Sequence, residues 1–434
     1  SNGGLVATPS RSGAFRFAAV VGDNVLIQSA QTEQGLAATD YIETGASTVQ
    51  AGLLENEPRI DYTGGTGSLL LEPQRTNIVT QSEYMVNYNK SSATGITANA
   101  GISPEGKSNA TYFYCNTTTT NGYIAQGWIE TSGVQYAVSF YAKAKELNRI
   151  YIKNVNDSGS QSWFDLSDGT YNLLSGIDSM SIESAGDGWY RCTAISTSTT
   201  TGIKWIPIIK GDANEGVYVY GLQIEAGSYP TSYIPTYGSS ETRVADSCLA
   251  TSVSDVIGQI TGVLFVEMSA LADDGTFRQI TLSDGTSSNL IHFDYSSSSN
   301  GLRVFTRRAG VASSFTYTMT DTTANAKFAL RYAQNDYALF IDGVKVASNT
   351  TCSIPESMSD IEFDNGAGSN QLEANLKQFV LFPTALSDAQ CSALTVEGLK
   401  EEILTSYIAA VDTLEDGAEA RLDTYLQNLE DLIV

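Results

Sequence analysis

Short runs of alternating apolar and polar residues recur along most of the chain, and helical periodicity is absent before residue 399. In one such run the apolar positions fall on every second residue: Val134, Tyr136, Val138 and Phe140. Alternate residues of a β-strand face the same side, so this run predicts a strand with one buried face. Residues 337–341 and 344–346 are β-prone and flank Asp342-Gly343, which predicts a tight hairpin. The pattern predicts an all-β chain built from antiparallel sandwiches.

The distribution of aromatic residues divides this β-rich part into two units. All four tryptophans fall between about residues 80 and 245: Trp128, Trp163, Trp189 and Trp205. This clustering predicts a unit with its own core. A second unit extends from about residue 250 to 395. At its end, Ser387 and Gln390 have the spacing of a capping box, which predicts a short helix.

A helical pattern begins at residue 399, where apolar residues recur three or four positions apart. The residues expected to form its apolar stripe are Leu404, Ile408, Val411, Leu422, Tyr425, Leu429 and Leu432. The other face is largely acidic, and Gly417 marks a bend or a break. Such a helix needs an apolar partner, which is either the same helix of sister subunits or the body of the protein.

Charge excludes several classes of partner. The chain has 434 residues, with 24 Lys and Arg against 48 Asp and Glu, which gives a formal net charge of −24. A chain this acidic repels phosphate backbones and anionic lipids, so we expect no nucleic-acid binding and no membrane insertion. Apolar runs are only a few residues long, so no segment is expected to span a bilayer. The first four residues show no secretory leader pattern.

Cysteine and histidine usage limits the chemistry further. The five cysteines are widely spaced and form no CxxC pair: Cys115, Cys192, Cys248, Cys352 and Cys391. We therefore expect reduced thiols, as in a protein assembled inside a cell, and no zinc site or disulfide framework. The chain has one histidine, His292, in an alternating run. Because a Ser-His-Asp triad or a multi-histidine metal site would have to use it, histidine-based catalysis is not expected.

Residues 58–62 (PRIDY) and 67–77 (GSLLLEPQRTN) form a distinctive pair of motifs. Residues 186–191 (GDGWYR) and 216–236 add a strand-entry motif and a closing motif. Together these stretches resemble a jelly-roll module of the modular tail-fibre and virion-surface proteins of bacteriophages. The fold of that module resembles carbohydrate-binding jelly rolls. Trp189 lies where these modules place a core aromatic residue, so the resemblance implies a structural role for Trp189.

Residues 376–388, with residues 339–343, are similar to the last strands of concanavalin/laminin-G-like domains. The resemblances cover about residues 40–395. They imply two tandem antiparallel β-sandwiches, a jelly roll and then a concanavalin/laminin-G-like domain, followed by a C-terminal amphipathic helix. The implied domains are a lead-in segment (1–78), the jelly roll (79–247), the second sandwich (248–396) and a helical oligomerisation or docking segment (397–434).

The resemblance also implies a function. It indicates a non-enzymatic structural protein of a bacteriophage virion, assembled in the host cytoplasm, either a tail fibre or receptor-binding protein or a head fibre. The implied partners are sister subunits in a homotrimer, other virion proteins and host-surface glycans. Two alternatives remain: a bacterial or prophage carbohydrate-binding adhesin, and a polysaccharide-degrading enzyme on the concanavalin-like sandwich.

Glycan binding requires exposed aromatic rings that stack on sugars, with planar polar groups that bind hydroxyls. The candidates are Tyr123, Trp128, Trp163, Trp205, Gln223, Glu225 and Arg303. The alternative for the aromatic residues is the sandwich core, for Gln223 and Glu225 a solvated sheet face, and for Arg303 pairing with neighbouring acids. No cofactor is expected. The one metal considered is a calcium ion held by Asp165 and Asp168, although both residues also fit a turn.

Overall fold

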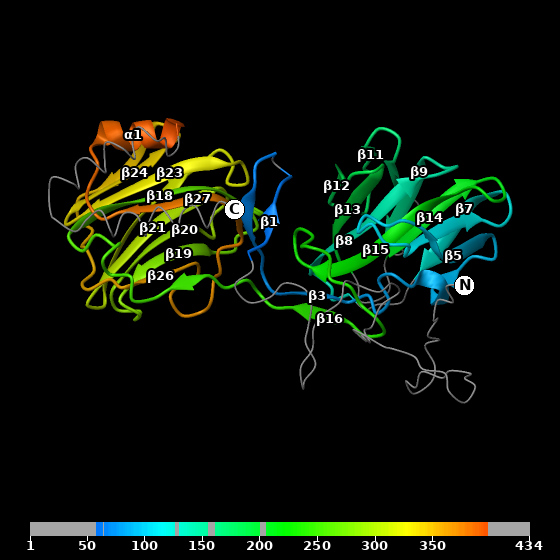
Figure 1. Cartoon of the computed structure of the whole chain (residues 1–434), viewed down its shortest axis with the longest axis horizontal. Coiled ribbons are helices and arrows are strands. Elements are labelled where there is room, and N and C mark those ends of the chain that lie inside the picture. The colour runs from blue at the N-terminus through cyan, green and yellow to red at the C-terminus, as the bar shows by residue number, and fades with distance from the viewer. Residues whose placement is uncertain (1–57, 64, 126–129, 155–160, 200–204, 398–434) are drawn as a thin grey trace, which may run out of the picture. The chain divides into compact units, whose positions relative to one another are not determined.

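The computed structural model describes residues 58–397 except 64, 126–129, 155–160 and 200–204. In this part of the chain the structure is mostly antiparallel β-sheet, with one α-helix, α1 (Asp388–Glu397), and one 3-10 helix, η1 (Met85–Asn87). The strands form two sandwiches (Figure 1). This confirms the predicted all-β sandwich architecture. The helical stripe predicted from Leu404 to Leu432 lies outside the described residues, and no described helix is both long and apolar enough to cross a membrane.

The first sandwich contains two six-stranded sheets, which we name the β8 sheet and the β9 sheet after a central strand of each. The β8 sheet has the order β12 (Ser179–Ser184), β13 (Trp189–Thr197), β8 (Gln135–Ala144), β15 (Gly216–Ala226), β6 (Ala110–Cys115) and β5 (Thr94–Gly101). The β9 sheet has the order β11 (Thr170–Asn172), β10 (Ser162–Asp165), β9 (Arg149–Asn154), β14 (Trp205–Gly211), β7 (Thr119–Ala125) and β4 (Asn89–Lys90).

The alternating run that predicted a strand forms β8. Val138 and Phe140 are buried in the core between the two sheets, as predicted. Ala137 and Ser139, on the opposite side of β8, are buried as well. The reason is a covering segment, residues 229–237, which packs on the outer face of the β8 sheet.

Trp189 is buried, in line with the structural role expected of it, but it lies on the outer face of the β8 sheet and not in the core between the two sheets. Its side chain packs with Ala110 and Tyr220, and Tyr233 of the covering segment lies against the same cluster. The indole Nε1 donates a hydrogen bond to the carbonyl oxygen of Ile102 at 3.2 Å. The ring therefore buries its apolar area while its one polar atom is satisfied.

The second sandwich pairs a seven-stranded sheet with a six-stranded sheet, named the β18 sheet and the β20 sheet. The β18 sheet has the order β1 (Ile60–Asp61), β2 (Ser68–Leu71), β27 (Ala374–Phe382), β18 (Thr261–Ala270), β23 (Ala326–Ala333), β24 (Asp336–Ile341) and β25 (Val344–Asn349). The β20 sheet has the order β17 (Leu249–Ala250), β26 (Asp360–Glu362), β19 (Arg278–Ser283), β20 (Leu290–Tyr295), β21 (Gly301–Arg308) and β22 (Val311–Thr318).

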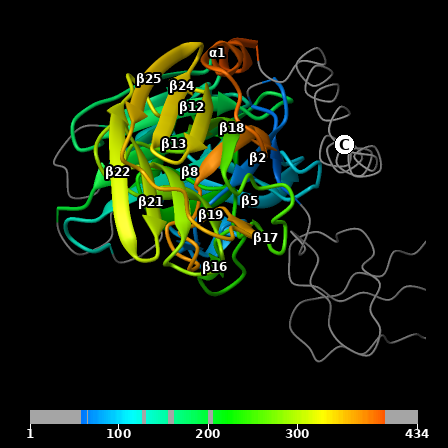
Figure 2. The same ribbon diagram turned by 90° about the vertical axis from the view of Figure 1, so that its left-hand side faces the viewer.

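Two local predictions in this sandwich are confirmed. Asp342 and Gly343 have positive φ angles of 44° and 89° and connect β24 to β25, as a two-residue hairpin requires. At α1, the amide of Gln390 donates to Ser387 Oγ at 3.2 Å and Gln390 Oε1 accepts from the Ser387 amide at 2.9 Å. The helix lies over β23, β24 and β25, and Leu394 is buried in a separate apolar cluster with Phe340 (Figure 2).

The chain enters the second sandwich before it forms the first. Residues 1–78 were expected to be a lead-in segment, but β2 pairs with β27, with Leu69 opposite Leu376. Leu71 is part of the second core. The chain then forms the first sandwich and returns, and the outgoing strand β3 (Arg75–Asn77) pairs with the returning strand β16 (Glu241–Arg243). The first sandwich is therefore an insertion within the second.

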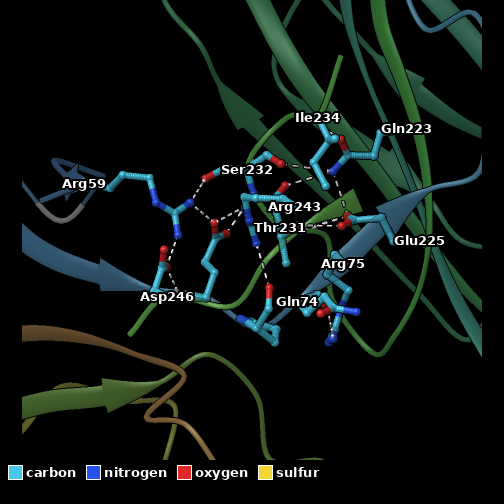
Figure 3. Close-up of polar contacts among 12 residues, drawn as sticks. Arg59, Gln74, Arg75, Gln223, Glu225, Thr231, Ser232, Ile234, Arg243 and Asp246 are labelled. Atoms are coloured by element: carbon cyan, nitrogen blue, oxygen red, sulfur yellow. Dashed lines mark hydrogen bonds and ion pairs between the residues drawn. The ribbon is translucent and has the colours of Figure 1, made fainter. Parts of the chain in front are cut away.

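A buried ion cluster joins the two passages of the chain (Figure 3). Glu72 is 5% exposed, and its carboxylate binds the guanidinium groups of Arg59 and Arg243, the latter at 2.5 Å. It also accepts the amide of Ser232 at 2.8 Å. Asp246 pairs with Arg59 and accepts the Glu72 amide at 2.6 Å. Two motif residues, Arg59 and Glu72, thus serve the fold.

The electrostatics of Glu72 follow from this geometry. Burial alone would raise its pKa, but Arg243 and Arg59 outweigh burial and hold the pKa below the ordinary value of 4.5. A carboxylate whose folded pKa is depressed stabilises the fold above its unfolded pKa. That stabilisation is lost as the pH falls through the folded pKa, so the cluster weakens only in acid.

We predict that Glu72→Gln lowers the free energy of unfolding by about 3 kcal/mol, because Arg243 loses its carboxylate partner and Arg59 keeps only Asp246. The measurement is urea unfolding followed by tryptophan fluorescence, since all four tryptophans lie between residues 128 and 205. Glu241→Gln, which changes an exposed carboxylate on β16, is the control and should leave the unfolding midpoint unchanged. Equal midpoints for the two variants would contradict the assigned role of Glu72.

Candidate functional site

One row of side chains crosses four strands of the β9 sheet. Trp163 on β10 is paired with Tyr151 on β9, Tyr151 with Ile208 on β14, and Ile208 with Tyr123 on β7. Paired residues of adjacent strands project from the same face of a sheet. The four side chains, three of them aromatic, therefore form a continuous row, which we call the aromatic row.

The aromatic row faces away from the core. Ile150 and Ile152 flank Tyr151 and are fully buried between the sheets, and Phe164 next to Trp163 is fully buried as well. Strict alternation then directs Tyr151 and Trp163 outward, and both are half-buried. Tyr123 is half-buried as well, whereas Ile208, between Tyr151 and Tyr123, is buried, so the three rings reach solvent and Ile208 does not.

Basic side chains accompany the rings. The guanidinium carbon of Arg149 lies 4.2 Å from the Trp163 ring centroid, and Lys210 Nζ lies 4.0 Å from the Tyr151 ring centroid. Both are cation–π contacts. Arg149, Tyr151 and Lys210 line a depression of about 300 Å³ that also includes Asp165, whereas Trp163 lies outside its lining. In a chain with a net charge of −24, this is a local concentration of positive charge.

Asp165 is the acidic residue of this depression, and its carboxylate is hydrogen-bonded to neighbouring residues. Its carboxylate accepts Arg149 Nε at 2.7 Å and the Ser167 amide at 3.1 Å. Burial would raise its pKa, but the bonds from Ser167 and Arg149 lower it overall. Asp165 therefore stays ionised at neutral pH and orients Arg149, whereas a general acid needs a raised pKa.

The structure brings two of the predicted aromatic candidates, Tyr123 and Trp163, into this row. Trp205 begins β14, where its backbone pairs with Asn154, but its side chain lies outside the described residues. Trp128 also lies outside them. Sequence reasoning missed Tyr151. Its signal was the alternation of residues 149–153, where apolar residues flank the tyrosine.

The expectation that Gln223 and Glu225 lie on a sheet surface that faces a ligand is wrong. Both are fully buried on β15, beneath the covering segment. Gln223 Oε1 accepts the Ile234 amide at 2.6 Å, and Glu225 accepts the Thr231 amide at 2.9 Å (Figure 3). Their polar groups hold the covering segment in place, so they are not available to a ligand.

Arg303 lies on β21 of the second sandwich and does not belong to the aromatic row. It forms an ion pair with the fully buried Asp294 at 2.9 Å, which agrees with the expected pairing with an acid. The calcium hypothesis gains no support from Asp165 and Asp168, since each accepts hydrogen bonds within its own turn. Among the described residues, no group of three or more His, Cys, Asp or Glu side chains could hold a metal ion.

Comparison with known proteins finds only weak structural similarity. No protein-family model matches the chain, and no curated protein matches it in sequence. Among solved structures, a Ruminococcus gnavus IT-sialidase CBM40 is 12% identical with a TM-score of 0.29, covering 33% of this chain and 91% of that one. NanB sialidase from Streptococcus pneumoniae is 14% identical with a TM-score of 0.29. The match covers 34% of this chain and 26% of the NanB chain.

Sheep galectin-11 is 11% identical with a TM-score of 0.25. The match covers 32% of this chain and the whole galectin chain. At these identities and scores, the similarities concern the β-sandwich fold. The chain therefore has a weak structural similarity to the sandwiches of a carbohydrate-binding module and a galectin.

Proposed function

We propose that this protein binds glycans through the aromatic row of its first sandwich. The observation that carries the proposal is the alignment of Trp163, Tyr151 and Tyr123 in one register row on a solvent-facing sheet. The C–H faces of sugars pack against aromatic rings, while charged and amide groups bind the hydroxyls. The row offers both kinds of contact.

The dimensions of the row favour an oligosaccharide over a single sugar. The row crosses four strands and therefore spans about 14 Å, from the usual strand spacing of about 4.8 Å. Arg149 and Lys210 lie beside two of its rings, and Lys153 lies two residues beyond Tyr151 on the same face of β9. A chain of sugars lying along the row would contact several rings and cations at once.

The proposed activity is binding and not bond cleavage. Glycoside hydrolysis by the usual route needs two carboxyl groups, one of them with a raised pKa. Asp165 has the opposite shift, because Ser167 and Arg149 bind its ionised form. The row with its basic neighbours is a surface for adhesion.

We further propose that the protein is a surface component of a bacteriophage virion that attaches to host glycans, either a tail fibre or a head fibre. The support is the resemblance of residues 58–62, 67–77 and 216–236 to virion-surface modules. A bacterial adhesin is the alternative within the same binding function. The proposed assembly is a homotrimer, formed through the apolar stripe from Leu404 to Leu432.

Binding to an array of bacterial surface polysaccharides tests the first proposal. Trp163→Ala and Tyr151→Ala should each weaken binding of the best array ligand about tenfold, because losing a stacked ring costs about 1.4 kcal/mol. Titration calorimetry measures the change. The control is Tyr171→Ala, an exposed tyrosine on β11 that is not part of the row. A blank array, or equal affinities for all the variants, would overturn the proposal.

Sedimentation velocity at micromolar concentration tests the assembly. The full chain should sediment as a trimer, and a chain that ends at Glu397 should sediment as a monomer because it lacks the apolar stripe. A monomeric full chain would refute the trimer and leave the glycan proposal standing.

A further inference from the structure

The β20 sheet of the second sandwich also has an outward face. Leu302 and Val304 of β21 point into the core, so Arg303, Phe305 and Arg307 project from the opposite side. Their partners on β20 and β22 share this side. We call this side of the sheet the Phe305 face. Its half-buried or exposed members are Arg303, Phe305, Arg307, Ser314 and Thr316, and the buried His292 and Asp294 lie on the same side.

Arg303 is held in a fixed orientation on this face. Asp294, which is fully buried, accepts its Nη2 at 2.9 Å and its Nε at 3.2 Å. The guanidinium carbon lies 4.6 Å from the Phe277 ring centroid and 5.3 Å from that of Phe305. Within the described residues Nη1 donates no hydrogen bond. One edge of the guanidinium is thus anchored, and Nη1 remains as a donor for a ligand.

Arg307 places a second guanidinium at the same ring. Its central carbon lies 5.2 Å from the Phe305 centroid, and its Nη1 donates to the Ser287 carbonyl oxygen at 2.8 Å. Among the described residues Arg307 has no acidic partner, so its charge is not balanced locally. On the neighbouring strand, exposed Ser314 and Thr316 lie opposite Phe305 and Arg303 and offer hydroxyl groups.

We propose that the Phe305 face is a second binding site, separate from the aromatic row, for a carboxylate-bearing sugar of the uronic acid class. The sugar ring packs near Phe305, its carboxylate pairs with Arg307, and Arg303 Nη1 and the β22 hydroxyls bind its oxygens. An aromatic ring between two guanidinium groups suits a ligand that is both ring-shaped and anionic. The site does not depend on the proposed function of the aromatic row.

His292 provides a direct reporter, because it is the one histidine in the chain and its ring stacks on Phe305 with centroids 5.5 Å apart. Gln279 Nε2 lies 3.2 Å from its Nδ1. Burial and then Arg303 lower the pKa of His292 to about 4, with a smaller contribution from Arg307 and an opposing one from the Asn365 backbone. Burial raises the pKa of the neighbouring Asp294 to about 6, against the effect of Arg303.

We predict that the imidazole signal of protein labelled with 13C-histidine titrates with a pKa of about 4. Because this value lies below the ordinary 6.5, protonation of His292 destabilises the fold as the pH falls from 6.5 toward 4. Asp294 acts in the opposite direction, because the folded state binds its proton more tightly between pH 3.8 and about 6. A histidine pKa near 6.5 would contradict the described burial.

The test of the site uses the full chain labelled with 13C-histidine and tetragalacturonate as the probe. We expect tetragalacturonate to shift the His292 signal at pH 7, and the fully methyl-esterified tetramer, which lacks the charge, to shift it at least tenfold more weakly. Arg307→Gln should weaken binding about tenfold. This variant is preferred to Arg303→Gln because it leaves no buried carboxylate unpaired. Trp163→Ala should leave the shift unchanged, which separates this site from the aromatic row.

The matched control is Arg308→Gln, since Arg308 follows Arg307 in the chain but pairs with Glu356. It should bind tetragalacturonate as the unmodified chain does. Equal weakening by both arginine variants would show nonspecific charge attraction and overturn the proposal. So would an unshifted His292 signal at millimolar tetragalacturonate, or equal shifts from the charged and esterified tetramers.

Discussion

The arrangement of this chain depends on one set of ion pairs. In it, the buried Glu72 carboxylate binds the guanidinium groups of Arg59 and Arg243. It joins the segment that leaves the second sandwich to the segment that returns to it. The same carboxylate accepts the amide of Ser232, which lies in the covering segment of the first sandwich. Because the covering segment buries the outer face of the β8 sheet, the β9 sheet provides the outward face that carries the aromatic row.

The motif residues have a structural explanation. Arg59 and Glu72 form the ion cluster, and the Asn77 side chain accepts the Ile224 amide at 3.1 Å and donates to the Ile234 carbonyl oxygen at 2.8 Å. Gln223 fixes the covering segment from below. The motif residues therefore close the first sandwich and join it to the second, and the candidate ligand-binding residues lie elsewhere.

Local patterns in the sequence predicted the strands, the hairpin at Asp342 and the cap at Ser387, because each depends on residues close together in the chain. The aromatic row depends on the register of separate strands, so Tyr123 and Trp163 could be proposed individually but not as one row with Tyr151. The alternation around Gln223 is the same whether solvent or a later segment covers that face. The pairing of β2 with β27 joins residues about three hundred positions apart. Nothing in the sequence of either strand indicates which strand is its partner.

The insertion of one sandwich within the other determines how the chain carries mechanical force. Residue 58 precedes β1 and residue 397 ends α1, and both elements pack in the second sandwich. Tension applied between these two points therefore loads the second sandwich and bypasses the first. Tension applied between the first sandwich and either of these points instead passes through the paired strands β3 and β16 and through the ion cluster beside them. The pairing of those two strands is therefore a mechanical connection between the two sandwiches.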